Sequence, residues 1–536
     1  MIQVGDKICV FPEHSRMVVR VDDPVHQQTV GALPTVARKG NLYQVPWSIG
    51  TCRFFYNLGF TDALDAAPIS FEQLPLVEGK YPMMAHQRRT AAFMSLFGRG
   101  YILSEPRTGK TGAAIIALDY LQRIRAITGG VLIITTLTTM HGVWKENILA
   151  TLPGARVQVV HGKTRAKDLE TPADFYSTNY DSVRLSEKAF VKAIETGRIG
   201  AIVIDEMTHV GNSASQRHKA IYNICNKYGV KYVWGLTGSP ADNPEMVFGM
   251  CRTVNPDKLP CTTKSAWINL TTYQYGPQPY MRAVARGASE VIRNAMQPAI
   301  RFAKKDILDL PPVTTQTRTC ELSAEQRTMR NELKTQATAL LESGERITAA
   351  NGGVLMNKLM QVALGVVRGD NREAVILDHR ERTQAILDAI EETNRKVVIF
   401  CGYTAGIRML VDEISKAGYT CDMVDGSVTG TKRAQILHDF QYEKDPRVLV
   451  CHPTTTAMGV ELSAADTMIF DGVPLTGGFV YAQSIERLSS AKQTASSINI
   501  IHIVSTPEER KALAALQKGY DLGQEVAKMF EDFAHE

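Results

Sequence analysis

Residues 104–111, with the sequence SEPRTGKT, combine a glycine, a lysine and a hydroxyl in an order that suits phosphate binding. The apolar run 101–103 precedes them, and the apolar helical run 113–118 follows. In a strand–loop–helix of this kind, backbone N–H groups and the helix N-terminus attract a polyphosphate. The spacing predicts that Lys110 reaches the outer phosphates and that Thr111 places its hydroxyl on Mg²⁺.

Two positions of this loop depart from the usual pattern. Ser104 stands at the first glycine position, and Arg107 stands where a small residue is common. The alternative interpretation is a surface turn that caps a helix. The preceding strand favours the nucleotide site, with these residues in contact with the nucleotide: Arg107, Thr108, Gly109, Lys110 and Thr111.

Two acidic residues, Asp205 and Glu206, follow the apolar run 201–204. A carboxylate at a strand end can hold the Mg²⁺ that Thr111 touches, and the next carboxylate can orient the attacking water. We therefore predict Asp205 as the metal ligand and Glu206 as the catalytic carboxylate. The alternative is an ordinary strand end with solvated acids. A third motif, GLTGSP at 235–240, ends another strand with a hydroxyl-rich loop suited to sensing the γ-phosphate, although alone it would be a turn.

The elements that position these motifs form two series. From Val77 to about Val254, apolar β-branched runs at 131–134, 201–204 and 232–236 alternate with helical segments. A second series has runs at 396–400, 448–450, 467–470 and 498–503. Apolar strands separated by helices predict parallel sheets covered on both faces. The expected fold class is α/β, with two tandem parallel-sheet domains that carry helical insertions and a small β-rich N-terminal domain.

The expected domain boundaries follow from these series. Residues 1–75 form the N-terminal accessory domain, with strands near 7–11, 17–21 and 42–46, and residues 76–254 form the first parallel-sheet domain. A helical linker covers 255–310 and ends at the hinge Leu310-Pro-Pro312. The second parallel-sheet domain covers 311–510 with a helical insertion at 321–366, and a helical tail covers 511–536.

Composition narrows the class of protein only slightly. The 536 residues include 60 lysines and arginines and 55 aspartates and glutamates, so the formal charge is +5. This balance neither shows nor excludes a nucleic-acid partner, because a local basic groove matters more than the sum. The nine cysteines contain no CxxC pair, so neither a zinc ribbon nor a disulfide framework is indicated.

The N-terminus, MIQVGDK, has no basic segment followed by an apolar one, and no apolar run approaches the length of a membrane span. We expect a cytoplasmic protein, in the host cytoplasm if it is viral, without membrane contact.

The order of the loop, the acidic pair and the Thr-Gly-Ser-Pro segment resembles the superfamily-two helicases and translocases, and the match sharpens toward their Swi/Snf-like branch. Upstream, His86-Gln87 is similar to the segment that contains the family's adenine-reading glutamine. Trp144 and Glu146 resemble the segment after motif Ia, and 205–212 resembles the Asp-Glu-Ala-His box. The resemblance implies that Gln87 binds the nucleotide.

The second series resembles the same family. Residues 424–427, followed by Lys432-Arg433, resemble its Asp-Gly-Ser segment, and 459–466, which begins at Gly459, resembles motif V. Gln483 and Arg487 align with motif VI, so the resemblance implies a nucleotide contact at Gly459 and catalytic roles for Gln483 and Arg487. Two departures stand out. Thr208 replaces the histidine of the box, and Ser490 replaces the second arginine of motif VI, where an arginine finger accelerates phosphoryl transfer.

Hydroxyl side chains on loops are expected to contact the phosphates of a nucleic acid. The candidates are Thr136, Thr138, Thr237, Ser427, Thr454 and Thr455. The alternative is that they are simple turn residues. The segments 43–46 and 53–60 also resemble the substrate-recognition module of HARP-type annealing helicases. Trp47, Phe54, Phe55 and Phe60 are expected to form the core of that small domain, while Arg53 stays open for nucleic acid.

The resemblance implies that the parallel-sheet domains 76–254 and 311–510 are two tandem RecA-like domains. It also implies an ATP- and Mg²⁺-dependent DNA helicase or translocase that acts as a monomer on duplex, forked or branched DNA. Two alternatives stay open at this point. One is an RNA-dependent ATPase, and the other is a nucleotide-gated binding scaffold in which Ser490 weakens turnover.

Overall fold

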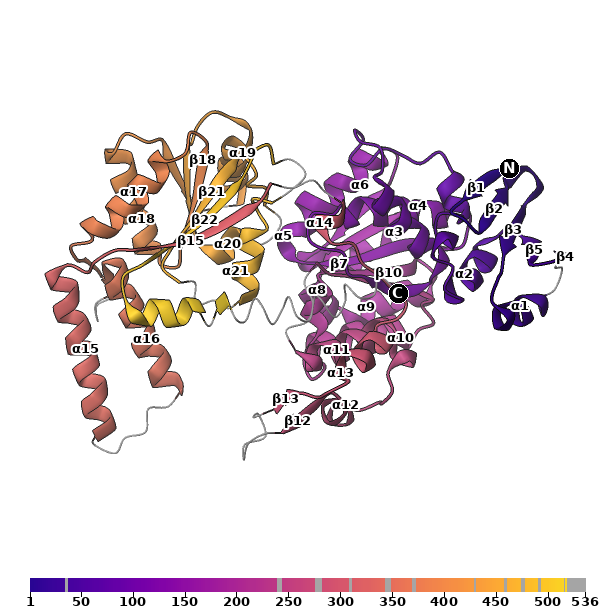
Figure 1. Ribbon diagram of the computed structural model, residues 1–536, viewed down its shortest axis with the longest axis horizontal. Coiled ribbons are helices and arrows are strands. Elements are labelled where there is room, and N and C mark those ends of the chain that lie inside the picture. The colour runs from indigo at the N-terminus through magenta and orange to yellow at the C-terminus, as the bar shows by residue number, and fades with distance from the viewer. Residues whose placement is uncertain are drawn as a thin grey trace. The chain divides into compact units, whose positions relative to one another are not determined.

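Figure 1 shows the protein as a computed structural model. The structure describes residues 1–33, 37–238, 243–274, 282–307, 311–342, 349–368, 373–428, 430–456, 460–473, 478–489, 493–514 and 516–517. The chain divides between Ile307 and Leu308 into two compact units.

The first unit begins with a five-stranded antiparallel sheet in the order β1-β2-β3-β5-β4. Every second residue of β3 and β5 is buried, including Met17, Val19, Tyr43 and Val45, because successive side chains of a strand point to opposite faces. The elements of this region are β1 (Ile2–Val4), β2 (Ile8–Phe11), η1 (Pro12–His14), β3 (Arg16–Arg20), α1 (Pro24–Gly31), β4 (Ala37–Lys39), β5 (Leu42–Pro46), α2 (Ile49–Asn57), η2 (Thr61–Ala63) and η3 (Pro68–Phe71).

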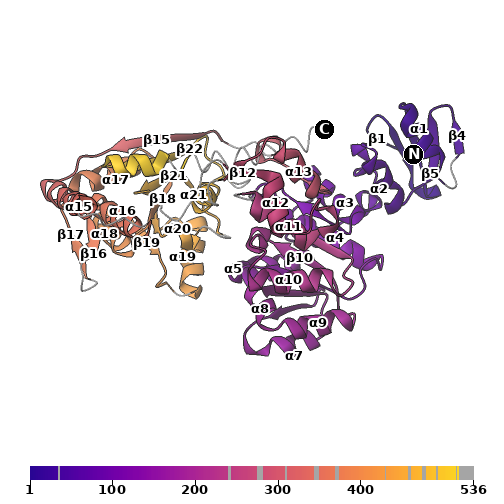
Figure 2. The same cartoon turned by 90° about the horizontal axis from the view of Figure 1, so that it is seen from below.

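This small sheet shares a hydrophobic core with the domain that follows it. Phe55 is fully buried, and Trp47, Phe54 and Phe60 pack against the same cluster, as the sequence leads us to expect. That cluster continues into α3 (Ala85–Leu96) and α4 (Lys110–Arg123). Arg53 donates a hydrogen bond from Nη1 to the carbonyl oxygen of Leu96 at 3.4 Å. In Figure 2 the N-terminal strands lie beyond α2 and α3 at one end of the unit.

A seven-stranded parallel sheet forms the centre of the first unit, in the order β14-β6-β11-β10-β7-β9-β8. All six residues of β7 are buried, which explains its continuous apolar sequence. The strands are β6 (Arg99–Ile102), β7 (Gly130–Thr135), β8 (Val157–Val160), β9 (Phe175–Asn179), β10 (Ile199–Asp205), β11 (Tyr232–Leu236) and β14 (Ala299–Ile300). The predicted α/β class is therefore confirmed.

The helices on the two faces of this sheet follow the strands in chain order, as expected for parallel crossovers. After α3 and α4 they are α5 (Leu137–Thr139), the π-helix η4 (Met140–Lys145), α6 (Glu146–Thr151), η5 (Gly162–Thr164), α7 (Arg165–Glu170), α8 (Tyr180–Leu185), α9 (Glu187–Glu195), η6 (Met207–Val210), α10 (Gln216–Asn226) and α11 (Pro244–Val254).

The segment that the sequence assigns to a linker contributes to this sheet. Its strand β14 pairs with β6, with Ala299 opposite Tyr101 and Ile300 opposite Ile102. The remaining elements of the segment are η7 (Pro256–Lys258), α12 (Lys264–Thr271), β12 (Thr272–Gln274), β13 (Arg282–Val284), α13 (Ala288–Ala295) and α14 (Lys304–Ile307).

The second unit is built on a six-stranded parallel sheet in the order β15-β22-β21-β18-β20-β19. Its elements are β15 (Val313–Thr319), α15 (Ala324–Glu342), α16 (Ala349–Leu364), β16 (Val366–Arg368), β17 (Ala374–Ile376), α17 (Arg380–Glu391), β18 (Lys396–Cys401), α18 (Thr404–Lys416), β19 (Cys421–Val424), α19 (Gly430–Tyr442), β20 (Val448–Cys451), α20 (Pro453–Thr456), β21 (Ala465–Asp471), α21 (Gly478–Ile485) and β22 (Ile498–Val504). The helices α15 and α16 lie side by side and extend away from the sheet (Figure 1).

Ion pairs hold this unit together at two places. Arg382 on α17 is 3 % exposed and pairs with Asp471 at 2.6 Å and with Glu509 at 3.0 Å. On α15, Arg330 and Lys334 both pair with Glu508, at 2.9 and 2.6 Å. The acids Glu508 and Glu509 lie in the helical segment 507–514, so these pairs tie the last described helix to α15 and α17.

Within the described ranges, no helix combines the length and apolar character that crossing a bilayer requires. The same residues contain no group of three or more histidine, cysteine, aspartate or glutamate side chains placed to hold a metal ion.

Candidate functional site

The phosphate-binding loop of the sequence lies between β6 and α4, as predicted. Arg107 and Gly109 both have positive φ angles, 64° and 77°, and Gly109 is the residue that precedes the first turn of α4. Lys110 begins the helix, and its ammonium donates hydrogen bonds to the carbonyl oxygens of Ser104 at 2.7 Å and Glu105 at 2.9 Å. The loop therefore curls around the position of its lysine.

Gln87 lies against this loop from the side of α3. Its Oε1 accepts a hydrogen bond from the backbone N–H of Met84 at 2.9 Å, which caps the helix, and its amide faces Gly109. A Cβ atom at Gly109 would lie 1.9 Å from Gln87 Nε2, so only glycine suits this position. His86, next to it, contacts the carbonyl oxygen of Thr108 through Nε2 at 2.7 Å.

Ser104, which replaces the usual glycine, has a specific contact. Its hydroxyl accepts a hydrogen bond from the backbone N–H of Phe302 at 3.1 Å. The next residue, Glu105, accepts one from the backbone N–H of Lys304 at 2.9 Å and pairs with Arg301 at 3.4 Å. The segment after β14 is therefore bonded along the first half of the loop.

The acidic pair lies at the same edge of the sheet as the loop. In the parallel register, Ile102 of β6 pairs with Leu236 of β11, and Leu236 pairs with Asp205 of β10. The charges are near enough to act on each other. Burial lowers the pKa of Lys110, while the carboxylates of Glu206 and Asp205 oppose that shift.

Asp205 is held through one of its two oxygens. Oδ2 accepts a hydrogen bond from the indole N–H of Trp144 at 2.7 Å and another from the hydroxyl of Thr135 at 3.0 Å. No donor in the described part of the chain reaches Oδ1. One oxygen is thus anchored by neutral groups and the other is available to a cation.

Glu206 has a left-handed backbone conformation, with φ 55° and ψ 53°. The hydroxyl of Tyr180, at the start of α8, donates to the carbonyl oxygens of Asp205 at 2.5 Å and Glu206 at 3.0 Å. Burial, followed by the charges of the two acids, raises the pKa of Tyr180 well above its usual value, so the phenol stays a donor. His209, one position after Thr208, places its ring 5.1 Å from the Tyr180 ring.

The third motif also reaches the loop. A Cβ atom at Gly238 would lie 2.7 Å from a side-chain carbon of Pro106, so the two loops touch. Thr237 is 2 % exposed, and its backbone N–H donates to the carbonyl oxygen of Ile102 at 3.1 Å. The predicted sensor loop therefore borders the phosphate loop, although residues 239–240 lie outside the described ranges.

The nucleic-acid contacts predicted for this unit stay predictions. Thr136 follows β7, and its hydroxyl contacts that of Thr139 at 2.8 Å. The side chain of Thr138 lies outside the described part of the structure. The side chain of Thr237 is buried.

The candidates of the second unit occupy the ends of its strands and α21. Gln483 is 5 % exposed, and among the described residues its Oε1 has no hydrogen-bond partner, whereas Arg487 is 9 % exposed at the end of the same segment. Ser427 is exposed and donates to Asp425 Oδ1 at 2.6 Å. The hydroxyls of Thr454 and Thr455 bond to His452, at 2.8 Å to Nδ1 and 2.7 Å to the carbonyl oxygen.

Two predicted positions of this unit cannot be placed in the same way. Gly459 and Ser490 lie outside the described residues. Their suggested effects on nucleotide binding and turnover stay predictions.

Sequence reasoning missed the two donors to Asp205. From the sequence, Trp144 is linked only to the segment after motif Ia, and no role is assigned to Thr135, which follows the predicted strand 131–134. The hydroxyl cluster TTLTT at 135–139, directly after a buried strand, was the available signal for Thr135.

The arrangement in the first unit suits a magnesium-bound nucleoside triphosphate. Gly109 lets the Gln87 amide lie against the loop, and Lys110 begins a helix whose N-terminus favours phosphate. The hydroxyl of Thr111 and Oδ1 of Asp205 are hard oxygen donors of the kind Mg²⁺ prefers.

Comparison with known families agrees with this geometry. The model of the SNF2-related domain matches residues 86–364, more than half of the chain, and that of the helicase conserved C-terminal domain matches 380–492. The protein belongs to the SNF2-related family. Membership in the SNF2-related family makes it an ATPase core and implies that it hydrolyses ATP. The predicted resemblance is confirmed.

Individual SNF2-related relatives are distant. A Xenopus tropicalis protein, the SWI/SNF-related matrix-associated actin-dependent regulator of chromatin subfamily A-like protein 1, is 23 % identical over 444 residues, which cover 79 % of this chain and 42 % of the relative. The human DNA annealing helicase and endonuclease ZRANB3 is 22 % identical over 419 residues, 76 % of this chain and 37 % of the relative. The chain thus spans less than half the length of these relatives. The Sulfolobus solfataricus SWI2/SNF2 ATPase core in complex with dsDNA is similar with a TM-score of 0.41 and 19 % identity, covering 85 % of this chain and 95 % of that one.

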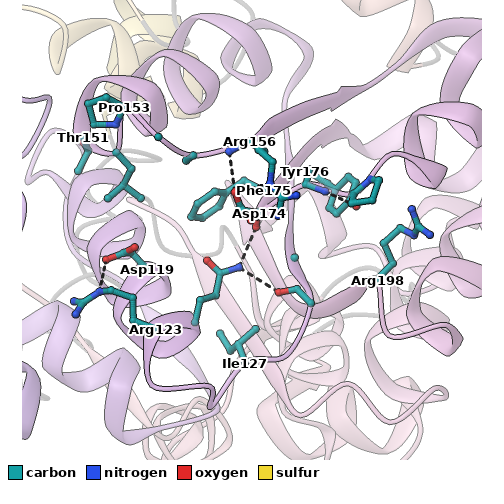
Figure 3. A pocket seen from close by; sticks show the side chains of 18 of the residues that line it. Asp119, Arg123, Ile127, Thr151, Pro153, Arg156, Asp174, Phe175, Tyr176 and Arg198 are labelled. Atoms are coloured by element: carbon teal, nitrogen blue, oxygen red, sulfur yellow. Dashed lines mark hydrogen bonds and ion pairs between the residues drawn. The ribbon is translucent and has the colours of Figure 1, made fainter.

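A cavity of about 950 Å³ lies at the opposite edge of the first sheet (Figure 3). It is lined near the amino-terminal ends of β7, β9 and β10, whereas the phosphate loop and Asp205 lie at the carboxyl-terminal ends. Its arginines are engaged by neighbours, for example Arg156 by Asp174 at 2.7 Å and Arg123 by Asp119 at 2.9 Å. This cavity is therefore separate from the nucleotide site.

Proposed function

We propose that the protein is an ATP-dependent DNA translocase or helicase. The observation that supports this best is the meeting of Lys110 and the Asp205-Glu206 pair at one edge of a parallel sheet in a chain of the SNF2-related family. DNA is favoured as the partner because two relatives carry DNA annealing or chromatin regulation in their names.

We assign roles in hydrolysis to the residues of the first unit. Lys110 and the N-terminus of α4 hold the phosphates, while Thr111 and Asp205 hold Mg²⁺. Glu206 orients the attacking water and accepts its proton. The bound metal neutralises charge that develops on the phosphoryl oxygens. Gln87 contacts the base from the flank of the loop.

We assign Gln483 and Arg487 to the same reaction on the strength of the family resemblance. The buried Oε1 of Gln483, which has no partner in the described residues, supports a role in binding a ligand. Arg487 supplies positive charge, which stabilises a transferring phosphoryl group.

Steady-state ATP hydrolysis tests this proposal. We would measure it without nucleic acid and with duplex DNA, forked DNA, single-stranded DNA and RNA. Duplex or forked DNA is expected to raise the rate several-fold above the basal value. Stimulation by RNA alone would favour the RNA-dependent ATPase, and the absence of any stimulation would favour the binding scaffold; either result contradicts the proposal.

The variant Glu206→Gln separates binding from chemistry. It keeps the metal ligand Asp205 and removes the base, so nucleotide binding should persist while the DNA-stimulated rate falls by about 100-fold or more. Lys110→Ala is the matched variant that should lose nucleotide binding as well. Normal turnover in Glu206→Gln would assign the base elsewhere.

A further inference from the structure

The carboxylate of Asp205 is reached by two donors from one continuous segment of chain. Thr135 is the last residue of β7, and Trp144 lies nine residues later in the π-helix η4. Both side chains are completely buried. Because both bonds end on Oδ2, they restrict the rotation of the carboxylate and leave Oδ1 without a donor among the described residues.

The π-helix explains how Trp144 reaches Asp205. Its wider turn changes the direction in which side chains leave the helix, and such turns occur frequently at functional sites. The segment is also anchored from the neighbouring strand, because the hydroxyl of Ser177 on β9 donates to the carbonyl oxygen of Met140 at 3.1 Å. The position of the indole N–H therefore depends on the conformation of 140–145.

A chain of hydroxyl groups leads from Asp205 to the loop after β7. The Oγ1 atoms of Thr135 and Thr139 lie 2.6 Å apart, and those of Thr139 and Thr136 lie 2.8 Å apart. A hydroxyl has one proton to donate. Since Thr135 donates to Asp205, it must accept from Thr139, and Thr139 can in turn accept from Thr136.

We propose that Trp144 and Thr135 are positioning residues for the metal ligand Asp205, and that through them the segment 136–145 is coupled to Mg²⁺ binding. The inference rests on the proposed function, in which Asp205 holds Mg²⁺, and its second part also uses the sequence prediction that Thr136 contacts a nucleic acid. Partners that orient a metal ligand commonly change metal affinity by about 10–100-fold when they are removed. A shift of segment 136–145 on nucleic-acid binding changes the two bonds to Oδ2 and so the affinity for the metal.

The variant Trp144→Phe keeps most of the buried ring and removes the N–H donor. Trp267→Phe is a matched control, because Trp267 is also fully buried in the first unit and donates its indole N–H to the carbonyl oxygen of Pro244 at 2.6 Å. We would titrate Mg²⁺ and follow the binding of a fluorescent, non-hydrolysable ATP analogue, which requires no turnover.

Trp144→Phe is expected to raise the half-saturating Mg²⁺ concentration about tenfold, without changing analogue binding in the absence of Mg²⁺. Trp267→Phe should keep the wild-type value. If the wild-type protein binds the analogue normally and Trp144→Phe leaves the half-saturating Mg²⁺ concentration unchanged, this inference is overturned and the proposed function is not. Failure of the wild-type protein to bind the analogue with Mg²⁺ would instead overturn the proposed function.

Thr135 gives an independent pair of variants in case the tryptophan variant does not fold. Thr135→Val removes the hydroxyl at nearly constant volume, and Thr135→Ser retains it. We expect the half-saturating Mg²⁺ concentration to rise several-fold in Thr135→Val and to keep its wild-type value in Thr135→Ser. Equal values in the two variants would contradict a positioning role for the hydroxyl.

Duplex DNA tests the coupling itself. In the wild-type protein, DNA should shift the half-saturating Mg²⁺ concentration by about fivefold or more, and Mg²⁺ with the analogue should change DNA affinity by the same factor. Thr135→Val should lose this shift. A shift of equal size in Thr135→Val would overturn the coupling through the hydroxyl chain.

Discussion

Two aspartates end central strands of the two parallel sheets, yet they have opposite surroundings. Asp205, the last residue of β10, receives hydrogen bonds on Oδ2 from the neutral groups of Trp144 and Thr135. Asp471, the last residue of β21, is 2 % exposed and forms an ion pair with Arg382. The two hydrogen bonds therefore orient the carboxylate of Asp205 without neutralising its charge, whereas the charge of Asp471 is balanced by that of Arg382.

If Asp205 holds Mg²⁺ as proposed, one position in a repeated architecture serves binding in one unit and stability in the other. A carboxylate that must hold a cation needs partners that carry no positive charge, because a bound arginine would compete with the metal. A carboxylate in a core needs a counter-charge, because an unpaired buried charge is costly. The partners of a strand-end acid are thus a better guide to its role than the acid itself.

Removing the counter-charge of the second unit should have the largest effect. Arg382→Met leaves Asp471 and Glu509 buried together without compensation, so the free energy of unfolding of that unit should fall by about 3–5 kcal/mol. Urea unfolding followed by far-UV circular dichroism measures this loss. All four tryptophans, at 47, 144, 234 and 267, lie in the first unit, so the transition seen by tryptophan fluorescence should not move.

Arg380→Met is the matched control for that variant. It makes the same substitution two residues away on α17, where the side chain is 88 % exposed and pairs with Asp378. An exposed pair of this kind adds little to stability, because solvent screens it. If Arg382→Met cost no more than Arg380→Met, the buried network would not stabilise the second unit.

The corresponding change in the first unit should affect turnover and spare stability. Asp205→Asn removes the charge that holds Mg²⁺, so the DNA-stimulated rate of ATP hydrolysis should fall by about 100-fold, or about 2.7 kcal/mol. The amide oxygen can still accept from Trp144 and Thr135, so the unfolding transition followed by tryptophan fluorescence should shift by less than about 1 kcal/mol. A rate within tenfold of the wild type would break the comparison.

Acidic pH should lower the stability of the second unit, by a smaller amount than the substitution Arg382→Met. Although burial opposes it, hydrogen bonds from Lys334 and Arg330 lower the pKa of Glu508 to about 2. A lowered pKa stabilises the fold above the unfolded value near 4.5, and this stability is lost as the pH falls from 4.5 toward 2. With solvent screening, we expect a loss of about 1–2 kcal/mol in the second unit.

The control for the experiment at acidic pH is Glu508→Gln, whose side chain cannot titrate. Its unfolding free energy should be lower at neutral pH and should change less between pH 5 and pH 3 than that of the wild type, measured by circular dichroism at each pH. Equal pH dependence in the two proteins would assign the acid sensitivity to other groups.

The fold was predictable from sequence where strands are continuously apolar. The runs at 131–134 and 201–204 became β7 and β10, because buried parallel strands select β-branched residues along their whole length. Strand β9, with the sequence FYSTN, and strand β15, with VTTQTRT, were not named, because their polar residues hide the pattern. The two-residue strand β14 is too short to leave a pattern at all.

The site was predictable only where function depends on residue order. The loop around Lys110 and the pair at Asp205 follow from motif spacing, and the structure brings them to one sheet edge. The contacts of Ser104 with Phe302 and of Trp144 with Asp205 join residues far apart in the chain, and one of them uses a backbone N–H that carries no sequence signal. Such contacts depend on tertiary packing, which no local pattern encodes.

The bonds between the phosphate loop and residues 300–304 have a mechanical consequence. The backbone of Leu103 donates to Ile300 at 2.9 Å and that of Glu105 donates to Phe302 at 3.1 Å, in addition to the bond from Phe302 to Ser104. These residues are the last part of the first unit before the chain leaves it at Ile307. A pulling force on the connecting chain would therefore reach the predicted phosphate loop through these bonds, so the loop also helps to anchor the end of the first unit.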